Sequence, residues 1–268
     1  MLQHFSTRFS ENFPNKKSVI GVIHLPALLG SPLYDGNLKK IYEQALQEAD
    51  ILNRHTDGII IENFGDKPFF PNSVPAETIA TMAAIGREVV RQTDVPIGIN
   101  VLRNDAEAAL AIATAIEAHF IRVNIHTHAV VADQGIIQGM AYKTLRLRKA
   151  LGSKVLIFAD VSVKHANPLT QKDLAVETQD LSERGLADAI IVSGTRTGET
   201  TNANDLDIVK QNTDLPILIG SGTTPDNLDT LSAANGFIVG SYFKENGKVT
   251  KPIVEKRVKY LVEKVRMF

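Results

Sequence analysis

Three side chains in the segment "FADVSVKHANP" are of the types that transfer protons or attack carbonyl carbons. Asp160 follows an apolar run, and a carboxyl group in such a place suits general acid–base catalysis. Lys164 can pair with Asp160, hold a phosphate or act as a nucleophilic amine, and His165 can carry a proton near neutral pH. We therefore expect catalytic roles for Asp160, Lys164 and His165. The alternative is a structural ion pair beside a solvated histidine.

Glu62 is the fourth catalytic candidate, because it directly follows three isoleucines in "DGIIIEN". A β-branched run is typical of a buried strand, whereas a carboxylate needs water, a partner or a ligand. We interpret Glu62 as the acid–base partner of Asp160, and Asn63 as a group that binds substrate oxygens. The alternative is an ion pair between Glu62 and an arginine of a neighbouring strand, Arg103 or Arg122.

Other polar side chains follow apolar runs in the same way. If the runs are parallel strands, these side chains meet at one end of the sheet, where sites are built. Amides, arginines and a histidine there would orient the hydroxyl and carbonyl groups of a substrate. The residues that we expect to bind substrate are His24, Asn63, Asn100, Arg103, Arg122, Asn124 and Asp133.

Small residues end the last three apolar runs, in "SGTRTG", "GSG" and "GSY". Glycine lets backbone N–H groups approach an anion, and barrels often hold a phosphate between the loops after their last two strands. Pro225 is expected to begin a helix just after the second of these loops. The alternative is that the glycines only form tight turns. The expected phosphate-binding residues are Ser193, Gly194, Gly220, Ser221, Gly222, Gly240 and Ser241.

The elements that must position these residues are short apolar runs alternating with amphipathic segments such as 105–118 and 172–185. Strands that are apolar on both faces and alternate with helices indicate a parallel sheet covered by helices. We predict an α/β fold, a single (β/α)8 TIM barrel, with an open doubly wound sheet as the alternative. The apolar runs are residues 18–24, 57–63, 96–101, 120–125, 154–161, 189–194, 216–222 and 236–241.

One domain is predicted to cover residues 1–268, because no change of composition or linker divides the chain. Residues 1–17 form an N-terminal extension, and the glycine-punctuated segment 126–141 is a candidate lid over the mouth. A short sequence pattern that occurs twice, here called the echo, supports a barrel built from two related halves. "QTDVPIGI" and "NTDLPILI" lie four units apart, and each ends a helix and enters a strand through proline.

Composition narrows the function further. The 268 residues are 44% hydrophobic, 22% charged and free of cysteine, with a net charge of −1. Thiolate chemistry and disulfides are excluded, and no basic excess indicates nucleic acid. No apolar stretch is long enough for a membrane span, so we expect a cytoplasmic protein. We expect no required cofactor and no metal site; Mg²⁺ held by Glu62 and Asp160 is the alternative. A homo-oligomer is compatible with the sequence.

Seven motifs give the chain a resemblance to the BtpA family and its SgcQ-like bacterial members. They are "GVIHLPALLGSP", "ENFGDKPF", "GINVLRNDA", "FIRVNIHTHA", "ADQGIIQG", "FADVSVKHA" and "VGSYFK". The resemblance implies a TIM barrel of the phosphate-binding type. It also implies two different roles, because SgcQ-like proteins are encoded among sugar-metabolism genes, whereas the family name comes from a factor for accumulation of photosystem I.

The polar ring at the strand ends favours an enzyme that acts on a small phosphorylated metabolite, above all a sugar phosphate. The expected chemistry is that of an isomerase or lyase, by proton transfer or aldol-type steps. Hydrolysis of a nucleoside or nucleotide is one alternative. The other is a non-catalytic assembly factor for a membrane complex, as the family name suggests.

Overall fold

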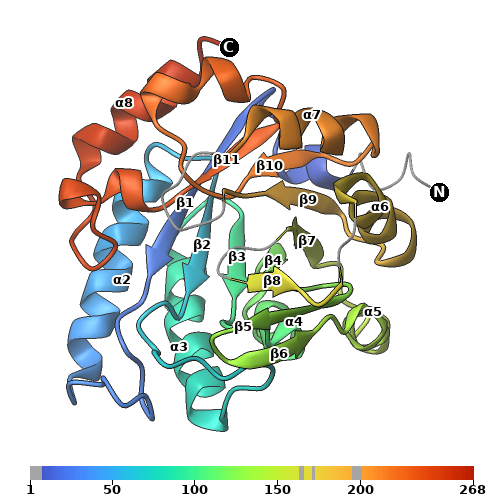
Figure 1. Ribbon diagram of the computed structural model, residues 1–268. Coiled ribbons are helices and arrows are strands. Elements are labelled where there is room, and N and C mark those ends of the chain that lie inside the picture. The colour runs from blue at the N-terminus through green and yellow to red at the C-terminus, as the bar shows by residue number, and fades with distance from the viewer. Residues whose placement is uncertain (1–7, 163–165, 171–172, 195–200) are drawn as a thin grey trace.

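Eight parallel strands close into a barrel in the computed structural model, which describes residues 8–162, 166–170, 173–194 and 201–268 (Figure 1). The order around the barrel is β1-β11-β10-β9-β7-β4-β3-β2, so the predicted TIM barrel is confirmed and the open sheet is wrong. The strands are β1 (Ser18–His24), β2 (Gly58–Glu62), β3 (Ile97–Asn100), β4 (Phe120–Val123), β7 (Leu156–Val161), β9 (Ala189–Val192), β10 (Ile217–Ile219) and β11 (Gly236–Val239).

Helices connect most of the strands and cover the outside of the barrel. α4 begins where Asp105 accepts a hydrogen bond from the Ala108 N–H at 2.9 Å, a side-chain cap for an otherwise unsatisfied donor. After β10 the chain forms only two short 3-10 turns, the first beginning at Pro225, instead of the expected helix. The α-helices are α2 (Leu38–Asn53), α3 (Ala76–Gln92), α4 (Ala106–Ile116), α5 (Ala141–Ala150), α6 (Leu174–Gln179), α7 (Ala203–Gln211) and α8 (Glu255–Val265). Within the described ranges, none of them has the length and apolar character needed to cross a membrane.

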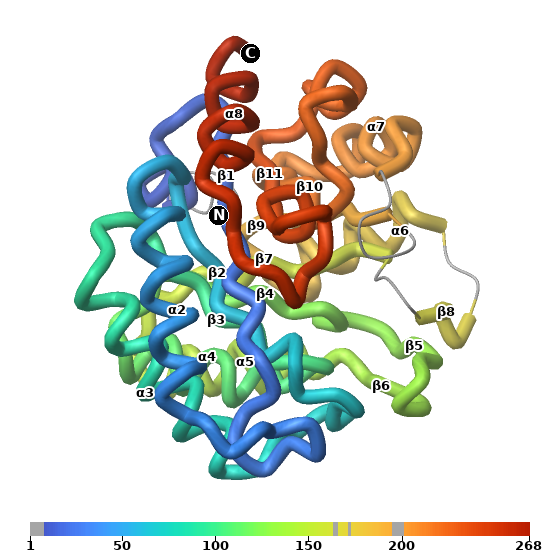
Figure 2. Tube along the Cα trace, turned by 90° about the vertical axis from the view of Figure 1, so that its left-hand side faces the viewer, coloured from blue at the N-terminus to red at the C-terminus, as the bar shows by residue number. Residues whose placement is uncertain are grey.

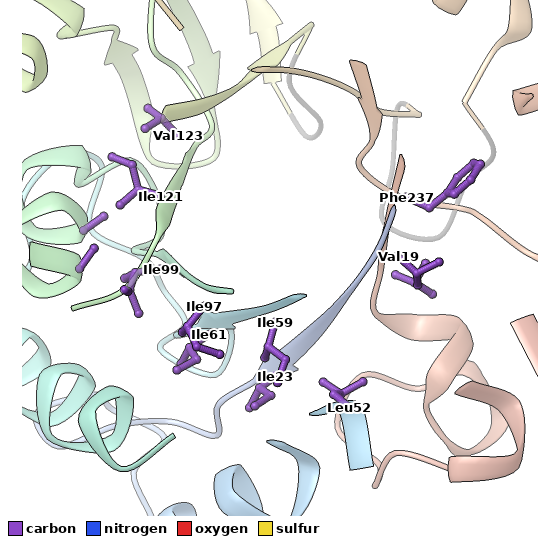
Figure 3. Close-up of a cluster of buried hydrophobic side chains, with 14 of the residues drawn as sticks. Val19, Ile23, Leu52, Ile59, Ile61, Ile97, Ile99, Ile121, Val123 and Phe237 are labelled. Atoms are coloured by element: carbon purple, nitrogen blue, oxygen red, sulfur yellow. The ribbon is translucent and has the colours of Figure 1, made fainter. Parts of the chain in front are cut away.

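Side chains alternate between two apolar layers along every strand, as the pleat requires. In β1, Val19 and Ile23 face the helices, whereas Ile20 and Val22 face the barrel axis. Figure 3 shows part of the outer layer, with the branched side chains of β1 to β4 on the side of the strands that faces the helices. The inner layer is smaller and more aromatic. On each strand, every second residue therefore points into the barrel, and we call this set of positions the inward parity of the strand.

Two phenylalanines of the N-terminal segment close the bottom of the barrel. Phe9 and Phe13 stack with ring centroids 4.9 Å apart, and Phe13 meets the edge of Phe120 at 5.7 Å. Phe120 stacks in turn on Phe158 of β7 at 4.5 Å. The predicted N-terminal extension thus contributes part of the barrel interior. Gly98 leaves space for this cluster, because a Cβ there would lie 2.2 Å from the Phe120 ring.

A repeated hydrogen bond fixes the bottom ends of alternate strands. In four places, the backbone N–H of the first or second residue of a barrel strand donates a hydrogen bond to a side chain. The accepting residue comes immediately before the neighbouring strand of the barrel. The donors and acceptors are Val19 to Asp57 at 2.7 Å, Ile97 to His119 at 3.1 Å, Ile157 to Asp188 at 2.7 Å, and Ile217 to Asn235 at 2.9 Å. The sequence echo belongs to this pattern, since its two copies lead into β3 and β10, the strands of the second and fourth of these bonds.

A small antiparallel sheet stands apart from the barrel strands. β5 (Ala129–Ala132) and β6 (Gly135–Gln138) form a hairpin, and β5 also pairs with β8 (Ala166–Pro168). Figure 2 shows the hairpin and β8 together at one side, away from α2 and α3. The segment 126–141, predicted as a lid, is therefore an ordered hairpin. Its movement stays a prediction.

We predict that Phe13→Ala lowers the free energy of unfolding by about 3–5 kcal/mol, because it empties the space between three other rings. The chain has no tryptophan, so the measurement is urea unfolding followed by far-UV circular dichroism. Phe70→Ala is the matched control, since Phe70 is 53% exposed, and should change stability by no more than about 0.5 kcal/mol. Equal effects of the two substitutions would contradict a packed barrel bottom.

Candidate functional site

The inward parity of the strands brings the predicted strand-end residues together at the top of the barrel. His24 lies opposite Glu62 in the β1–β2 register, and Glu62 lies opposite Asn100 in the β2–β3 register. Each of these residues continues the row of inner-layer side chains below it on its own strand. The predicted residues with this inward parity are His24, Glu62, Asn100, Arg122, Asn124, Asp160, Ser193, Gly220 and Gly240.

Asp160 and Arg122 form a buried, two-pronged ion pair at the centre of this row. Arg122 Nε donates to Asp160 Oδ2 at 2.9 Å and Arg122 Nη2 donates to Oδ1 at 2.8 Å. Asn124 and Ser193 add one hydrogen bond each, both at 3.2 Å. Burial acts to lower the pKa of Arg122, but the charge and hydrogen bonds of Asp160 raise it above the usual value. These contacts favour a positioning role for Asp160 over the acid–base role expected from the sequence.

His24 and Glu62 form a second pair, which faces the cavity. His24 Nε2 lies 4.0 Å from Glu62 Oε1, and each side chain is 9% exposed. Arg103 lines the cavity with them. Burial lowers the pKa of its guanidinium, and the nearby charge that most strongly acts to raise this pKa is the carboxylate of Asp160. A histidine, a glutamate and an arginine thus share one wall.

The cavity at the mouth has a volume of about 1480 Å³. It reaches most of the predicted residues but not all of them. The predicted residues in its wall are His24, Glu62, Arg103, Arg122, Asn124, Asp133, Gly220, Ser221, Gly222, Gly240 and Ser241. The predicted residues outside its wall are Asn63, Asn100, Asp160, Ser193 and Gly194. Lys164 and His165 lie outside the described residues.

Two of the predicted substrate-binding amides support the backbone. Asn63 accepts from the Leu102 N–H at 2.7 Å and donates to Asp66 at 3.0 Å, and it is 1% exposed. Asn100 donates to the Arg122 carbonyl at 3.1 Å and to Asn124 Oδ1 at 3.3 Å. Because both side chains are buried among protein partners, they orient other groups of the mouth.

Glycines in the predicted phosphate loops make room for site residues. A Cβ on Gly220 would lie 2.3 Å from Ser193 Oγ, and one on Gly240 would lie 2.5 Å from the His24 ring. Gly222 has a φ of +73°, which favours glycine. Close side-chain approach therefore explains Gly220 and Gly240, whereas turn geometry explains Gly222.

Two hydroxyl groups in the loop after β10 have no hydrogen-bond partner within the described ranges. They are Ser221 Oγ and Thr223 Oγ1, both buried atoms of residues that line the cavity. Most buried polar atoms in proteins are hydrogen-bonded. The loop itself is well held, because Asn227 donates to the Gly222 carbonyl at 2.7 Å and accepts from the Thr224 N–H at 2.9 Å. An acceptor such as a phosphate oxygen would satisfy the two hydroxyls.

The loop after β11 is anchored from behind by a buried ion pair. Lys244 Nζ lies 2.5 Å from Glu48 Oε1 of α2, and Lys244 is fully buried. Burial lowers the pKa of Lys244 and raises that of Glu48. The Lys244 N–H also donates to the Ser241 carbonyl at 3.0 Å. The pair therefore fixes the turn that carries Ser241 to the cavity.

The loop after β2 contributes residues that the sequence did not single out. Phe64 meets the His24 ring edge-on at 4.9 Å, and the ammonium of Lys67 lies over the Phe64 ring at 4.3 Å. Asp66 holds this loop to the loop after β1, because it accepts from the Leu28 N–H at 2.7 Å. The signal for these residues was the motif "ENFGDKPF", whose aromatic and basic positions follow Glu62 directly.

The C-terminal part of the chain also adds cations to the wall. Arg257, at the start of α8, places its guanidinium over the Tyr242 ring at 4.4 Å, and both residues line the cavity with Lys248. Tyr242 directly follows Ser241 in "GSY", but nothing in the local sequence links Lys248 or Arg257 to the strand ends. Only the fold brings them to the mouth.

The hairpin supplies one predicted ligand contact, because Asp133 and Gln134 at its turn line the cavity. The histidines just before it point elsewhere. His126 is buried with its Nε2 2.8 Å from the Gly185 carbonyl, and His128 Nε2 lies 3.3 Å from Asp180 Oδ2. Across the described ranges, no three His, Asp or Glu side chains gather as metal ligands would.

The fold and the cavity define an α/β barrel protein with a polar cavity at its mouth. The chain belongs to the BtpA family, whose model matches residues 15–267. An uncharacterised protein of Pyrococcus furiosus is 44% identical over 250 residues, which cover 92% of this chain and 94% of that protein. The photosystem I biogenesis protein BtpA of Synechocystis is 44% identical over 256 residues, 94% of this chain and 89% of that protein.

Among solved structures, N-(5′-phosphoribosyl)anthranilate isomerase from Pyrococcus furiosus has a similar fold. The TM-score is 0.57 at 14% sequence identity, and the match covers 94% of this chain and all of that one. At this identity, the likeness supports the barrel architecture alone.

We predict that Asp160→Asn lowers the free energy of unfolding by about 3 kcal/mol or more, because it leaves the buried Arg122 charge unbalanced. Urea unfolding is the measurement. Asp133→Asn, at the exposed hairpin turn, is the matched control and should be nearly neutral. Combining Asp160→Asn with Arg122→Met should recover part of the loss. A stable single variant would contradict the positioning role.

The pKa of His126 is lowered from 6.5 to about 4, mainly by burial. The unfolded chain therefore binds a proton that the folded chain does not, so stability falls as pH drops from about 6.5 towards 4. Between pH 7.5 and 5 this histidine should account for a loss of about 2 kcal/mol.

The comparison that tests this is urea unfolding of the wild type and of His126→Gln at both pH values. The glutamine amide can still donate to the Gly185 carbonyl but does not titrate. The variant should lose about 2 kcal/mol less than the wild type over this pH range. His55→Gln is the control, since His55 lies at the surface beside Glu255 at 2.8 Å. Parallel pH profiles of wild type and His126→Gln would contradict the assignment.

Proposed function

We propose that this protein is an enzyme that acts on a small phosphorylated metabolite, most simply a sugar phosphate, at the mouth of the barrel. The observation that carries the proposal is the pair of buried hydroxyls, Ser221 and Thr223, which lack partners among the described residues and line the cavity. A buried hydroxyl without a partner costs stability, and an oxygen of a bound phosphate would supply a partner. Both lie beside Gly222 in the loop after β10.

The charge of the cavity wall agrees with an anionic ligand. Five cationic and two acidic residues line it among the described residues, so the excess is three positive charges. Arg122 is neutralised by Asp160, which leaves an excess of two. The cations are Lys67, Arg103, Arg122, Lys248 and Arg257, and the carboxylates are Glu62 and Asp133.

The His24–Glu62 pair supplies the proton transfer in this proposal. Glu62 removes a proton from the carbon beside a substrate carbonyl, and His24 delivers a proton to the neighbouring carbon or oxygen. Arg103 stabilises the negative charge that develops between the two steps. This is the chemistry of an isomerase or lyase. Hydrolysis of a nucleotide is the closest alternative, with Glu62 activating water beside the same phosphate site.

We propose that this proton transfer proceeds without a metal ion. Both oxygens of Asp160 already accept hydrogen bonds from Arg122, so binding Mg²⁺ would require breaking a buried ion pair. Glu62 would then be the remaining carboxylate of the expected magnesium pair. Turnover in the presence of EDTA should match turnover with added Mg²⁺.

A second candidate is a non-catalytic factor for assembly of a membrane complex. It rests on the name of the Synechocystis relative, a photosystem I biogenesis protein that is 44% identical. The two functions separate at Glu62, because an assembly factor has no need of this carboxylate and should tolerate Glu62→Gln. The buried polar wall of the mouth favours the enzyme.

Thr223→Val provides the sharpest test of the phosphate site. Because it replaces an unpartnered buried hydroxyl by a methyl group of similar shape, it should leave the unliganded protein as stable or more stable. It should weaken binding of ribose 5-phosphate about tenfold, the loss of one hydrogen bond to a charged group. Calorimetric titration gives the affinity, and urea unfolding gives the stability.

Thr230→Val is the matched control, since the exposed Thr230 hydroxyl donates to the Asn227 carbonyl outside the cavity. In a screen of sugar phosphates, Glu62→Gln should retain binding and lose turnover. No binding of ribose 5-phosphate, of other sugar phosphates or of inorganic phosphate by the wild type would refute the proposed function.

A further inference from the structure

The half of the cavity wall that includes Phe64 combines Lys67 and Arg103 with several apolar and aromatic residues, which a sugar phosphate alone does not explain. Leu33, Phe64, Pro68, Phe69 and Leu102 line this half, and Leu33 is 65% exposed. These residues come from the loops after β1, β2 and β3. The phosphate half is built instead from the loops after β10 and β11. An exposed leucine beside aromatic rings in a polar mouth indicates contact with an apolar group.

A continuous row of contacts joins the two halves. The His24 ring packs on Gly240, where an added Cβ would lie 2.5 Å from it. His24 also meets Phe64, with ring centroids 4.9 Å apart and planes at 78°. Only the width of one imidazole ring therefore separates the phosphate loops from Phe64. Glu62 lies beside this imidazole, 4.0 Å from Nε2.

We propose that the substrate carries a planar unsaturated ring in addition to its phosphate, and that this ring packs against Phe64. The inference rests on the proposed function, because the phosphate end fixes which way the substrate lies. With the phosphate beside Gly240 and Ser241, the middle of the substrate crosses His24 and Glu62. Its far end then reaches Phe64 and the apolar wall.

The size of the cavity and the position of Lys67 agree with such a substrate. A volume of about 1480 Å³ exceeds the roughly 300–1,000 Å³ typical of small-molecule pockets. Lys67 is an exposed side chain whose ammonium lies over the Phe64 ring at 4.3 Å. The ring face therefore already attracts a partner from the cavity side. A planar ligand group can displace this flexible side chain or stack beside it.

The arrangement also indicates which bonds of the substrate change in the reaction. The acid–base pair lies between the phosphate end and the ring end, so the bonds that change are those of the linking sugar carbons. The substrate class is thus a phosphorylated sugar or sugar derivative with a planar ring attached, of which nucleotides are one example.

The test compares two probes that differ only by a planar base, ribose 5-phosphate and adenosine 5′-monophosphate, with inorganic phosphate as the reference. Stacking of a base on an aromatic side chain gives about a tenfold or greater gain in affinity. Calorimetric titration should show this gain for the wild type. Phe64→Leu should remove most of it, so the ratio of the two affinities falls towards one. Phe70→Leu, a phenylalanine outside the cavity wall, should keep the ratio.

A fluorescent reporter gives a second readout, because quenching shows contact with the ring even if the substitution changes the affinity. The chain has no tryptophan, so Phe64→Trp places a single indole at the proposed contact. Adenosine 5′-monophosphate should quench it saturably, and ribose 5-phosphate should not. Tyr142→Trp on α5, where Tyr142 is 57% exposed, is the control and should not respond to either probe.

The outcomes separate the two proposals. If ribose 5-phosphate binds but the base adds no affinity and no quenching, the ring subsite is wrong and the phosphate site stands. If none of the three probes binds the folded protein, the proposed function fails and the ring subsite falls with it. Circular dichroism confirms that each variant is folded before titration.

Discussion

Arg122 stands on β4 directly above Phe120, at a position where the barrel interior would otherwise hold an apolar side chain. A guanidinium in such a place is strongly unfavourable without a full set of partners, and Asp160 meets it with two short hydrogen bonds. Asn124 and Ser193 each donate a further hydrogen bond to the Asp160 carboxylate, and Asn100 donates one to the Arg122 carbonyl. The pair thus separates an apolar barrel below from a polar mouth above. His24, Glu62 and Arg103 lie on the polar side.

This division explains how much of the site could be predicted from the sequence. The strands of a barrel are apolar on both faces, so the polar residues that follow an apolar run mark the barrel mouth. The prediction located His24, Glu62 and Arg103 at the cavity for this reason. It could not distinguish residues that face the cavity from residues that support them. Asp160 ends a strand as Glu62 does, and only the position of Arg122 decides that Asp160 is enclosed.

Two further residues show where this pattern stops. Asn63 follows Glu62 and therefore has the opposite parity, which turns its amide towards Leu102 and Asp66. Phe64 lies in a loop, where no periodicity indicates direction, and tertiary packing against His24 alone places it at the cavity. Gly220 and Gly240 line the cavity, but the side chains that need the space at these positions come from other strands. Gly240 accommodates a histidine more than two hundred residues earlier in the sequence.

The bottom of the barrel shows the opposite character. Its hydrogen bonds repeat at alternate strands, with Asp57, His119, Asp188 and Asn235 each placed immediately before a strand. Such repetition is what related half-barrels would preserve, and the echo between 92–99 and 212–219 is its visible trace in the sequence. Among the described residues, the mouth shows no comparable repeat. Regularity is therefore kept where strands are joined and lost in the loops, each of which lines the cavity with different residues.

The position of His24 gives the closure of the barrel a functional consequence. β1 pairs with β11, so the first and last strands meet at one seam, and His24 packs on Gly240 across it. The proposed acid–base pair belongs to the loops and strands at the beginning of the chain, whereas the proposed phosphate loops belong to its end. In the proposed function, neither half places a substrate against the other until this seam forms. The Lys244–Glu48 ion pair joins the same two regions behind the seam, because it ties the loop after β11 to α2. Formation of the complete site and closure of the barrel are therefore one structural event.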